Sequence, residues 1–157
     1  MEYSKQQLTE SLRRFRALRD ALLHEDEGFT HNLHRFVEFC QSDPLVQSVL
    51  APLHEKYHPD AEAWWQQTRA QADRYVTRLP LPSDPAEELA LEYGLLLLAD
   101  AQESWVFQFG VALGKHKQSE WVNAFLVTVV RPFADELGNR LAEAANLATP
   151  EERALQA

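Results

Sequence analysis

Arg19 occupies an unusual place in the first predicted helix. At about 100° per residue, its side chain points into the middle of an apolar stripe. The stripe consists of Leu12, Phe15, Leu22 and Leu23. An arginine among such residues must meet a carboxylate or a phosphate, because an unpaired buried charge is strongly unfavourable. Its natural carboxylate partners are the acids of a later helix, Glu92, Asp100 and Glu103. Arg19 is therefore either half of an internal ion pair or part of an anion site.

The segment Arg19-Asp20-Ala21-Leu22-Leu23-His24 resembles the arginine, polar residue, three spacers and histidine of the HEPN-type ribonucleases. This resemblance, which covers only that segment, implies a helical protein that acts as a dimer and cleaves RNA without a metal. It also implies that Arg19 stabilises the scissile phosphate and that His24 transfers a proton during attack by the ribose 2′-hydroxyl. Arg19 and His24 are thus the candidate catalytic pair if the protein is an enzyme.

Two histidines one helical turn apart could bind a metal. The string His54-Glu55-Lys56-Tyr57-His58 fits the zincin pattern, in which both histidines bind zinc and the glutamate activates water. That mechanism needs an unbroken helix. Pro52 and Pro59 flank the string and disfavour such a helix.

A second pair at the same spacing, His34 with Glu38, joins His54 and His58 as possible metal ligands. Together the four resemble half of the hemerythrin ligand set, in which a first-helix histidine and a last-helix histidine and aspartate complete a di-iron site. The counterparts of those remaining ligands are not found here. The sequence therefore predicts no bound metal or cofactor, and these four residues are the weak candidates for one.

Trp64 and Trp65 are adjacent on a predicted helix and cannot both face one narrow core stripe. An exposed tryptophan beside an apolar stripe is typical of a protein contact or a ligand pocket. A helix packed between two neighbours also accepts two tryptophans about 100° apart, so a wide core face is the other interpretation.

Composition limits the classes of protein to consider. The chain has 157 residues, of which 45% are apolar, so one globular domain over residues 1–157 is expected. A lone cysteine, Cys40, and the absence of a long uncharged apolar run indicate a cytoplasmic protein without a membrane span. The net charge of -9 repels phosphate backbones, so nucleic acid is an improbable partner unless RNA is a substrate.

Five glycines, no isoleucine and many leucines and alanines predict an all-α bundle of six or seven helices. Helices should begin at Asp43-Pro44, Pro59-Asp60 and Asp84-Pro85, because an aspartate cap or a first-position proline favours a helix start. Residues 80–85 form a proline-rich linker between two helical halves, and residues 148–157 a frayed tail.

Three further expectations concern helix continuity. A long, central, buried helix should span about residues 85–113 and end at Gly114. The preceding helix should run from Asp60 to Leu79. Pro52 should kink or split its helix, and another kink is expected at Arg131-Pro132.

The sequence contains no glycine-rich phosphate loop, cysteine pair or nucleophile elbow, so most enzyme classes lack their usual signature. We therefore expect a non-enzymatic protein-interaction module, a small adaptor or regulator that binds another protein or itself near Trp64 and Trp65. The HEPN-type ribonuclease is the alternative. A helical protein that binds a small ligand or a metal is the third possibility.

Overall fold

The computed structural model describes residues 4–24 and 28–148, and within these ranges the chain is helical and has no strand. The helices are α1 (Lys5–His24), α2 (Phe29–Ser42), α3 (Pro44–Tyr57), α4 (Ala61–Gln71), α5 (Pro85–Ala101), α6 (Trp105–Ala112), α7 (Gln118–Phe125), the π-helical turn η1 (Leu126–Val130) and α8 (Arg131–Ala148). Because α7, η1 and α8 follow one another without a break, they form one rod. The prediction of an all-α bundle is confirmed. The predicted tail beyond Ala148 lies outside the described residues.

The predicted helix starts are present with the expected capping chemistry. Asp43, Asp60 and Asp84 each precede a helix, and each carboxylate accepts a hydrogen bond from a backbone N–H of the first turn. Pro44 and Pro85 stand at the first helical position, where a missing N–H removes no helical hydrogen bond. These starts are set by groups within three residues of each other.

The single long helix expected over 85–113 is wrong in its continuity. The chain leaves the helix at Gln102 and re-enters it at Trp105, so that α5 and α6 are separate. This break turns Trp105 towards Trp65 of α4, with the two ring centroids 5.4 Å apart. Because each aromatic side chain buries a large apolar area, the contact outweighs one interrupted helical turn.

The helix expected to reach Leu79 also ends early, at Gln71, and residues 72–84 form an irregular connection to α5. Val76 is buried in this connection, and its backbone N–H donates to the carbonyl of Ala112 at 2.8 Å. The contact with α6 therefore draws the chain away from the helical path. Gly114, with φ at 85°, follows the end of α6 as predicted.

The two internal prolines have different effects. Pro52 lies inside α3, which is not split. Pro132 has no N–H for the carbonyl of Thr128, and the turn before it widens into η1, where the Arg131 N–H bonds to Leu126 five residues back. The irregularity expected at Arg131-Pro132 is thus a π-helical turn in a continuous rod.

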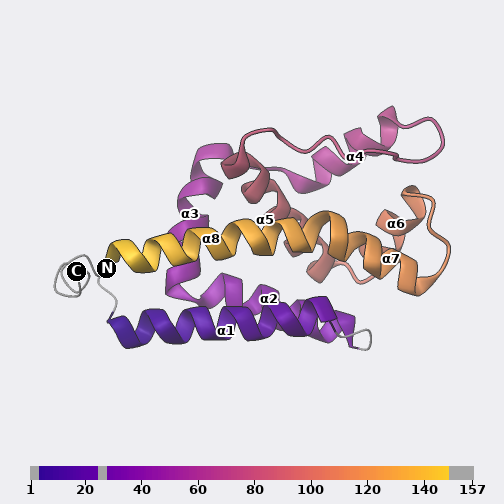
Figure 1. Ribbon diagram of the computed structural model, residues 1–157. Coiled ribbons are helices and arrows are strands. Elements are labelled where there is room, and N and C mark those ends of the chain that lie inside the picture. Colours follow the sequence, from indigo (N-terminus) through magenta and orange to yellow (C-terminus); the bar gives the residue numbers. More distant parts are fainter. Residues whose placement is uncertain (1–3, 25–27, 149–157) are drawn as a thin grey trace.

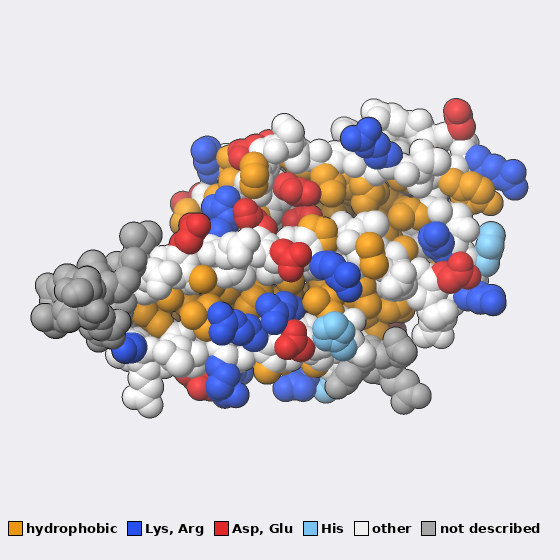
Figure 2. All heavy atoms as spheres, viewed as in Figure 1, with side chains coloured by type: hydrophobic (Ala, Val, Ile, Leu, Met, Phe, Trp, Pro, Cys, Tyr) orange, Lys and Arg blue, Asp and Glu red, His pale blue; other side chains and the backbone are white. Residues whose placement is uncertain are grey.

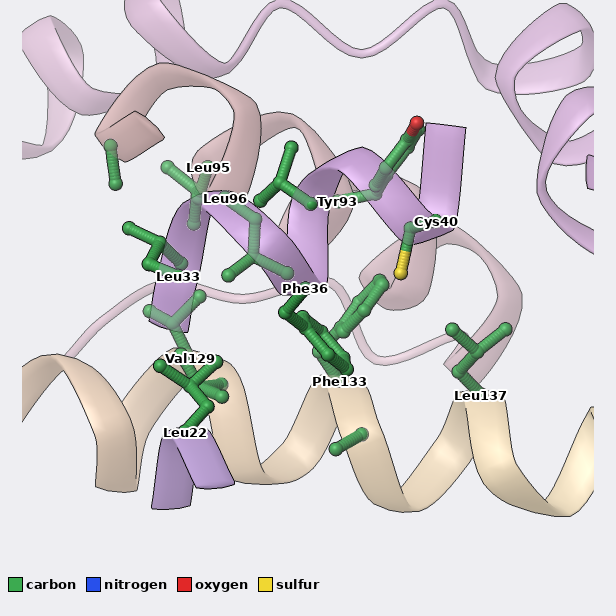
Figure 3. Packing of buried hydrophobic residues seen from close by; sticks show 14 of the residues in the cluster. Leu22, Leu33, Phe36, Cys40, Tyr93, Leu95, Leu96, Val129, Phe133 and Leu137 are labelled. Carbon is green, nitrogen blue, oxygen red and sulfur yellow. The ribbon is translucent and has the colours of Figure 1, made fainter. Parts of the chain in front are cut away.

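Figure 1 shows α8 running lengthwise beside α1, with α2, α3 and α5 packed around it. α5 is buried around most of its circumference from Leu89 to Ala99. In Figure 3, Phe36 of α2 meets Phe133 of α8, and their ring centroids lie 6.1 Å apart. At one end of the bundle, the α4–α5 connection and the α6–α7 loop come together (Figure 1). Within the described residues, no helix combines the length and apolar character needed to cross a membrane.

Candidate functional site

Trp64 and Trp65 are placed differently. Trp65 is 1% exposed and packs against Trp105 and Phe109, so it has no surface to offer a partner. Trp64 is half-buried, and its indole N–H donates to the carbonyl of Pro80 at 3.3 Å. Of the two predicted binding residues, only Trp64 retains exposed area, beside the α4–α5 connection.

Arg19 does not pair with any of the acids expected for it. Its Nε and Nη2 both lie 3.0 Å from Oδ1 of the neighbouring Asp20, and the guanidinium stands 6.0 Å from the centre of the Phe15 ring. Arg19 lies at the edge of the apolar stripe and not under it, since 29% of its side chain remains exposed. The expected ion pair with Glu92, Asp100 or Glu103 is therefore wrong. His24 is exposed as the last residue of α1.

A groove of about 440 Å³ runs beside Arg19 between α1 and α8. Its polar rim is formed by Arg16, Arg19, Asp135 and Asn139, and its apolar floor by Leu12, Phe15, Ala134, Gly138 and Ala142. Arg19 thus borders a groove large enough for a small ligand, whereas His24 is not among the lining residues. The carboxylate of Asp135 weakens the positive potential there.

The metal-ligand candidates form two separate pairs, His34 with Glu38 on α2, and His54 with His58 at the end of α3. His34 Nδ1 is 3.1 Å from Oδ1 of Asp100, and its Nε2 is 3.7 Å from a carboxylate oxygen of Glu38. His54 is exposed near the end of α3, and His58 ends that helix in the left-handed conformation, with φ at 44°. Among residues 4–24 and 28–148, no three His, Cys, Asp or Glu side chains converge in a way that could hold a metal ion.

Glu92 is the unusual charged group of the core. It is 1% exposed on α5, and its Oε2 accepts no hydrogen bond from the described residues. Burial raises the pKa of Glu92 to about 9, and the nearby carboxylates of Glu88 and Glu136 add to that shift. Arg140 Nε is 3.9 Å from Glu136, too far for a hydrogen bond. At neutral pH Glu92 is therefore an uncharged carboxylic acid.

Sequence reasoning missed the surface at the end of the bundle where the two loops meet. Three of the four large hydrophobic side chains that are exposed among the described residues lie there: Tyr75 at 39%, Phe107 at 45% and Val111 at 42%. Basic side chains flank them on both loops. We call this set the tip surface; it comprises Arg74, Tyr75, Arg78, Phe107, Val111, Lys115 and Lys117. In Figure 2, Lys and Arg side chains are spread over this end of the molecule, where exposed hydrophobic atoms, a histidine and acidic side chains lie among them.

The tip surface rests on a close contact between α6 and α7. A Cβ atom built on Gly110 would stand 2.5 Å from Cβ and 2.7 Å from Cα of Trp121, so the two helices meet backbone to side chain there. The Trp121 ring in turn meets the Phe107 ring edge-on, with centroids 4.6 Å apart. Phe107 is thus held in place although nearly half of it is exposed.

A cavity of about 520 Å³ opens in the α4–α5 connection next to Tyr75. Arg74 and Arg78 line it together with one acid, Asp73, and with the polar side chains Thr68, Gln71 and Thr77. Apolar area next to cationic side chains is an arrangement suited to binding another molecule.

Comparison of the chain with family models, with curated proteins and with solved structures gives no match.

Proposed function

We propose that the protein is a non-catalytic helical interaction module, an adaptor or regulator that binds a protein partner through the tip surface. The observation that carries the proposal is the concentration of exposed Tyr75, Phe107 and Val111 at one end of the bundle. Large apolar side chains gathered at a surface are typical of protein contacts, and aromatic anchors supply much of the binding energy. Because Trp65 is buried, we place the protein contact at the tip surface and not at the two adjacent tryptophans.

The order of the tip surface supports a binding role. Phe107 stacks edge-on against Trp121, and Val76 is tied to Ala112 by a backbone hydrogen bond. A side chain already held in one orientation loses less entropy when a partner covers it. A cytoplasmic location forms part of the proposal, because Cys40 is the one cysteine of the sequence and a chain with a single cysteine forms no internal disulfide.

The first prediction concerns partner capture. Immobilised wild-type protein should retain one or more proteins from a lysate of its source cells, and the double substitution Phe107→Ser/Val111→Ser should reduce their recovery about tenfold or more. The reason is that loss of a central aromatic anchor costs about 2 kcal/mol in a typical interface. Quantitative mass spectrometry of the retained fraction measures the effect.

Val127→Ser is the matched control, since Val127 is 47% exposed but lies on η1, outside the tip surface. Circular dichroism first establishes that both variants are folded. Recovery that is equal for wild type and the double variant would contradict the proposed contact surface.

The ribonuclease alternative is favoured by the groove that Arg19 borders. It is opposed by the pairing of Arg19 with Asp20, which occupies the guanidinium that a scissile phosphate would need. We therefore expect no cleavage of mixed cellular RNA in EDTA by the wild type or by Arg19→Ala/His24→Ala. Gel electrophoresis of the RNA is the measurement. Cleavage by the wild type alone would establish the ribonuclease in place of the interaction module.

A further inference from the structure

We infer that the tip surface recognises a short acidic segment of a partner protein that also carries apolar side chains. This inference rests on the proposed function, because it assigns the chemistry of the partner to the same surface. The occupant follows from the charge of the tip surface, from its cavity and from the apolar side chains between the charges.

The charge of this end is opposite to that of the whole chain. Residues 69–78 and 115–120 contain five basic side chains, Arg69, Arg74, Arg78, Lys115 and Lys117, against two acids, Asp73 and Glu120, whereas the chain carries a net charge of -9. Segregation of positive charge in an acidic protein creates a local potential that attracts a negatively charged partner.

Among the described residues, no ion pair joins a cation of the tip surface to a carboxylate. The ion pairs found among the described residues join Arg13 to Glu10, Arg19 to Asp20, His34 to Glu38 and to Asp100, and Arg140 to Glu136. Neither the four cations of the tip surface nor the neighbouring Arg69 takes part in these pairs. The Arg74 guanidinium lies 5.2 Å from the centre of its neighbour's ring, Tyr75, and so keeps its hydrogen-bond donors available.

The cavity and the exposed side chains of α6 lie at the same end of the bundle, where the Val76 N–H is bonded to the carbonyl of Ala112. Two cations, Arg74 and Arg78, and one acid, Asp73, line the cavity of about 520 Å³, so its lining keeps a net positive charge toward a carboxylate side chain of a partner. Tyr75 joins the cavity to the loop between α6 and α7, because its ring lies 3.5 Å from the position of a Cβ atom on Gly114. Phe107 and Val111 follow on α6, one helical turn apart. A segment that crosses this surface meets cations first and apolar side chains next.

This sequence of contacts selects among possible occupants. A small anion would use the arginines and leave Phe107 and Val111 exposed to water. A long nucleic acid would be repelled by the acidic remainder of the chain. An extended peptide that alternates acidic and apolar residues satisfies both halves of the surface.

Fluorescence anisotropy of labelled peptides with the full chain tests the inference. The probe is a peptide of about 12 residues in which Glu and Asp alternate with Leu and Phe. One comparison peptide has Gln and Asn in place of the acids, and another has Ser in place of Leu and Phe. We expect the wild type to bind the probe at least tenfold more tightly than either comparison peptide, and to lose affinity as salt increases.

Arg74→Glu/Arg78→Glu should weaken binding of the probe tenfold or more. Arg13→Glu/Arg16→Glu is the matched control, because it makes the same change in charge on α1 and should leave the affinity within about twofold. Equal binding of the Gln/Asn peptide, or an equal loss in both double variants, would overturn the inference. So would tighter binding of a single-stranded RNA of the same length.

A second copy of this acidic chain is the remaining occupant to distinguish. Sedimentation of the wild type and of Arg74→Glu/Arg78→Glu addresses it: a monomer in both supports the inference, whereas an oligomer that dissociates on substitution overturns it. The proposed function fails separately. If the peptides do not bind while capture still depends on Phe107 and Val111, the inference about an acidic partner segment is wrong and the proposed function stands. If capture does not depend on those residues, the tip surface is not the contact surface and the proposed function is wrong.

Discussion

Replacing Glu92 with glutamine should raise the free energy of unfolding at pH 7 by about 3 kcal/mol. The native state holds Glu92 as a neutral acid, because burial raises its pKa from 4.5 to about 9 with a further contribution from Glu88 and Glu136. In the unfolded chain the carboxyl ionises near its ordinary pKa, so unfolding at neutral pH releases a proton. Glutamine has a similar size and a neutral polar end, but it cannot ionise. The substitution therefore removes the free energy by which ionisation of the carboxyl stabilises the unfolded state.

The pH dependence gives the prediction its sign. Because the pKa of Glu92 is higher in the folded than in the unfolded state, its contribution to stability is fully present below pH 4.5 and is lost as the pH rises towards 9. Wild type and Glu92→Gln should therefore differ little at pH 4 and diverge up to about pH 9. Urea unfolding followed by circular dichroism at several pH values measures both curves.

Glu88→Gln provides the control for the Glu92 prediction. Glu88 lies one turn away on α5, and burial raises its pKa as well, but the residue is only half-buried. Its substitution should change the pH dependence much less. A Glu92→Gln variant that is less stable than the wild type at pH 8 would show that the fold stabilises the ionised carboxylate, and would contradict the prediction.

Gly110→Ala should destabilise the protein by about 3 kcal/mol, at the upper end of what overpacking usually costs. The added Cβ would lie 2.7 Å from the backbone Cα of Trp121, and a backbone atom cannot move aside as a flexible side chain can. α6 and α7 would have to separate, which would also displace Phe107 from the Trp121 ring. Thermal unfolding and urea unfolding measure the loss.

Gly138→Ala is the matched substitution in another helix. A Cβ atom at Gly138 would stand 3.4 Å from the nearest atom of the Phe15 ring, which is an ordinary contact. Alanine is also the better helix former, so we expect unchanged or slightly increased stability, by up to about 1 kcal/mol. If Gly110→Ala unfolds at the wild-type temperature, α6 and α7 are not packed as closely as described.

The surroundings of Arg19 and Glu92 could be predicted from the sequence only in part. Its position in the helical stripe predicts that Arg19 is buried and pairs with an acid of a distant helix. In the structure Arg19 lies at the edge of the stripe and forms its ion pair with the adjacent Asp20. The angular position of a side chain gives the direction in which it points, but the depth of burial depends on how closely α8 approaches α1. Glu92 differs in the opposite direction, because this acid is more deeply buried than a charged residue is expected to be. Its burial results from the helices that surround α5.

The helical class and the start of most helices follow from the amino-acid sequence alone. Asp43, Asp60 and Asp84 cap helices through hydrogen bonds that span three residues or fewer, and such contacts form whatever the rest of the chain does. The break between α5 and α6, the early end of α4 and the tip surface arise from tertiary packing and could not be predicted from the sequence. Each depends on contacts between distant segments, Trp65 with Trp105 or Val76 with Ala112, whose burial outweighs the local preference for continued helix.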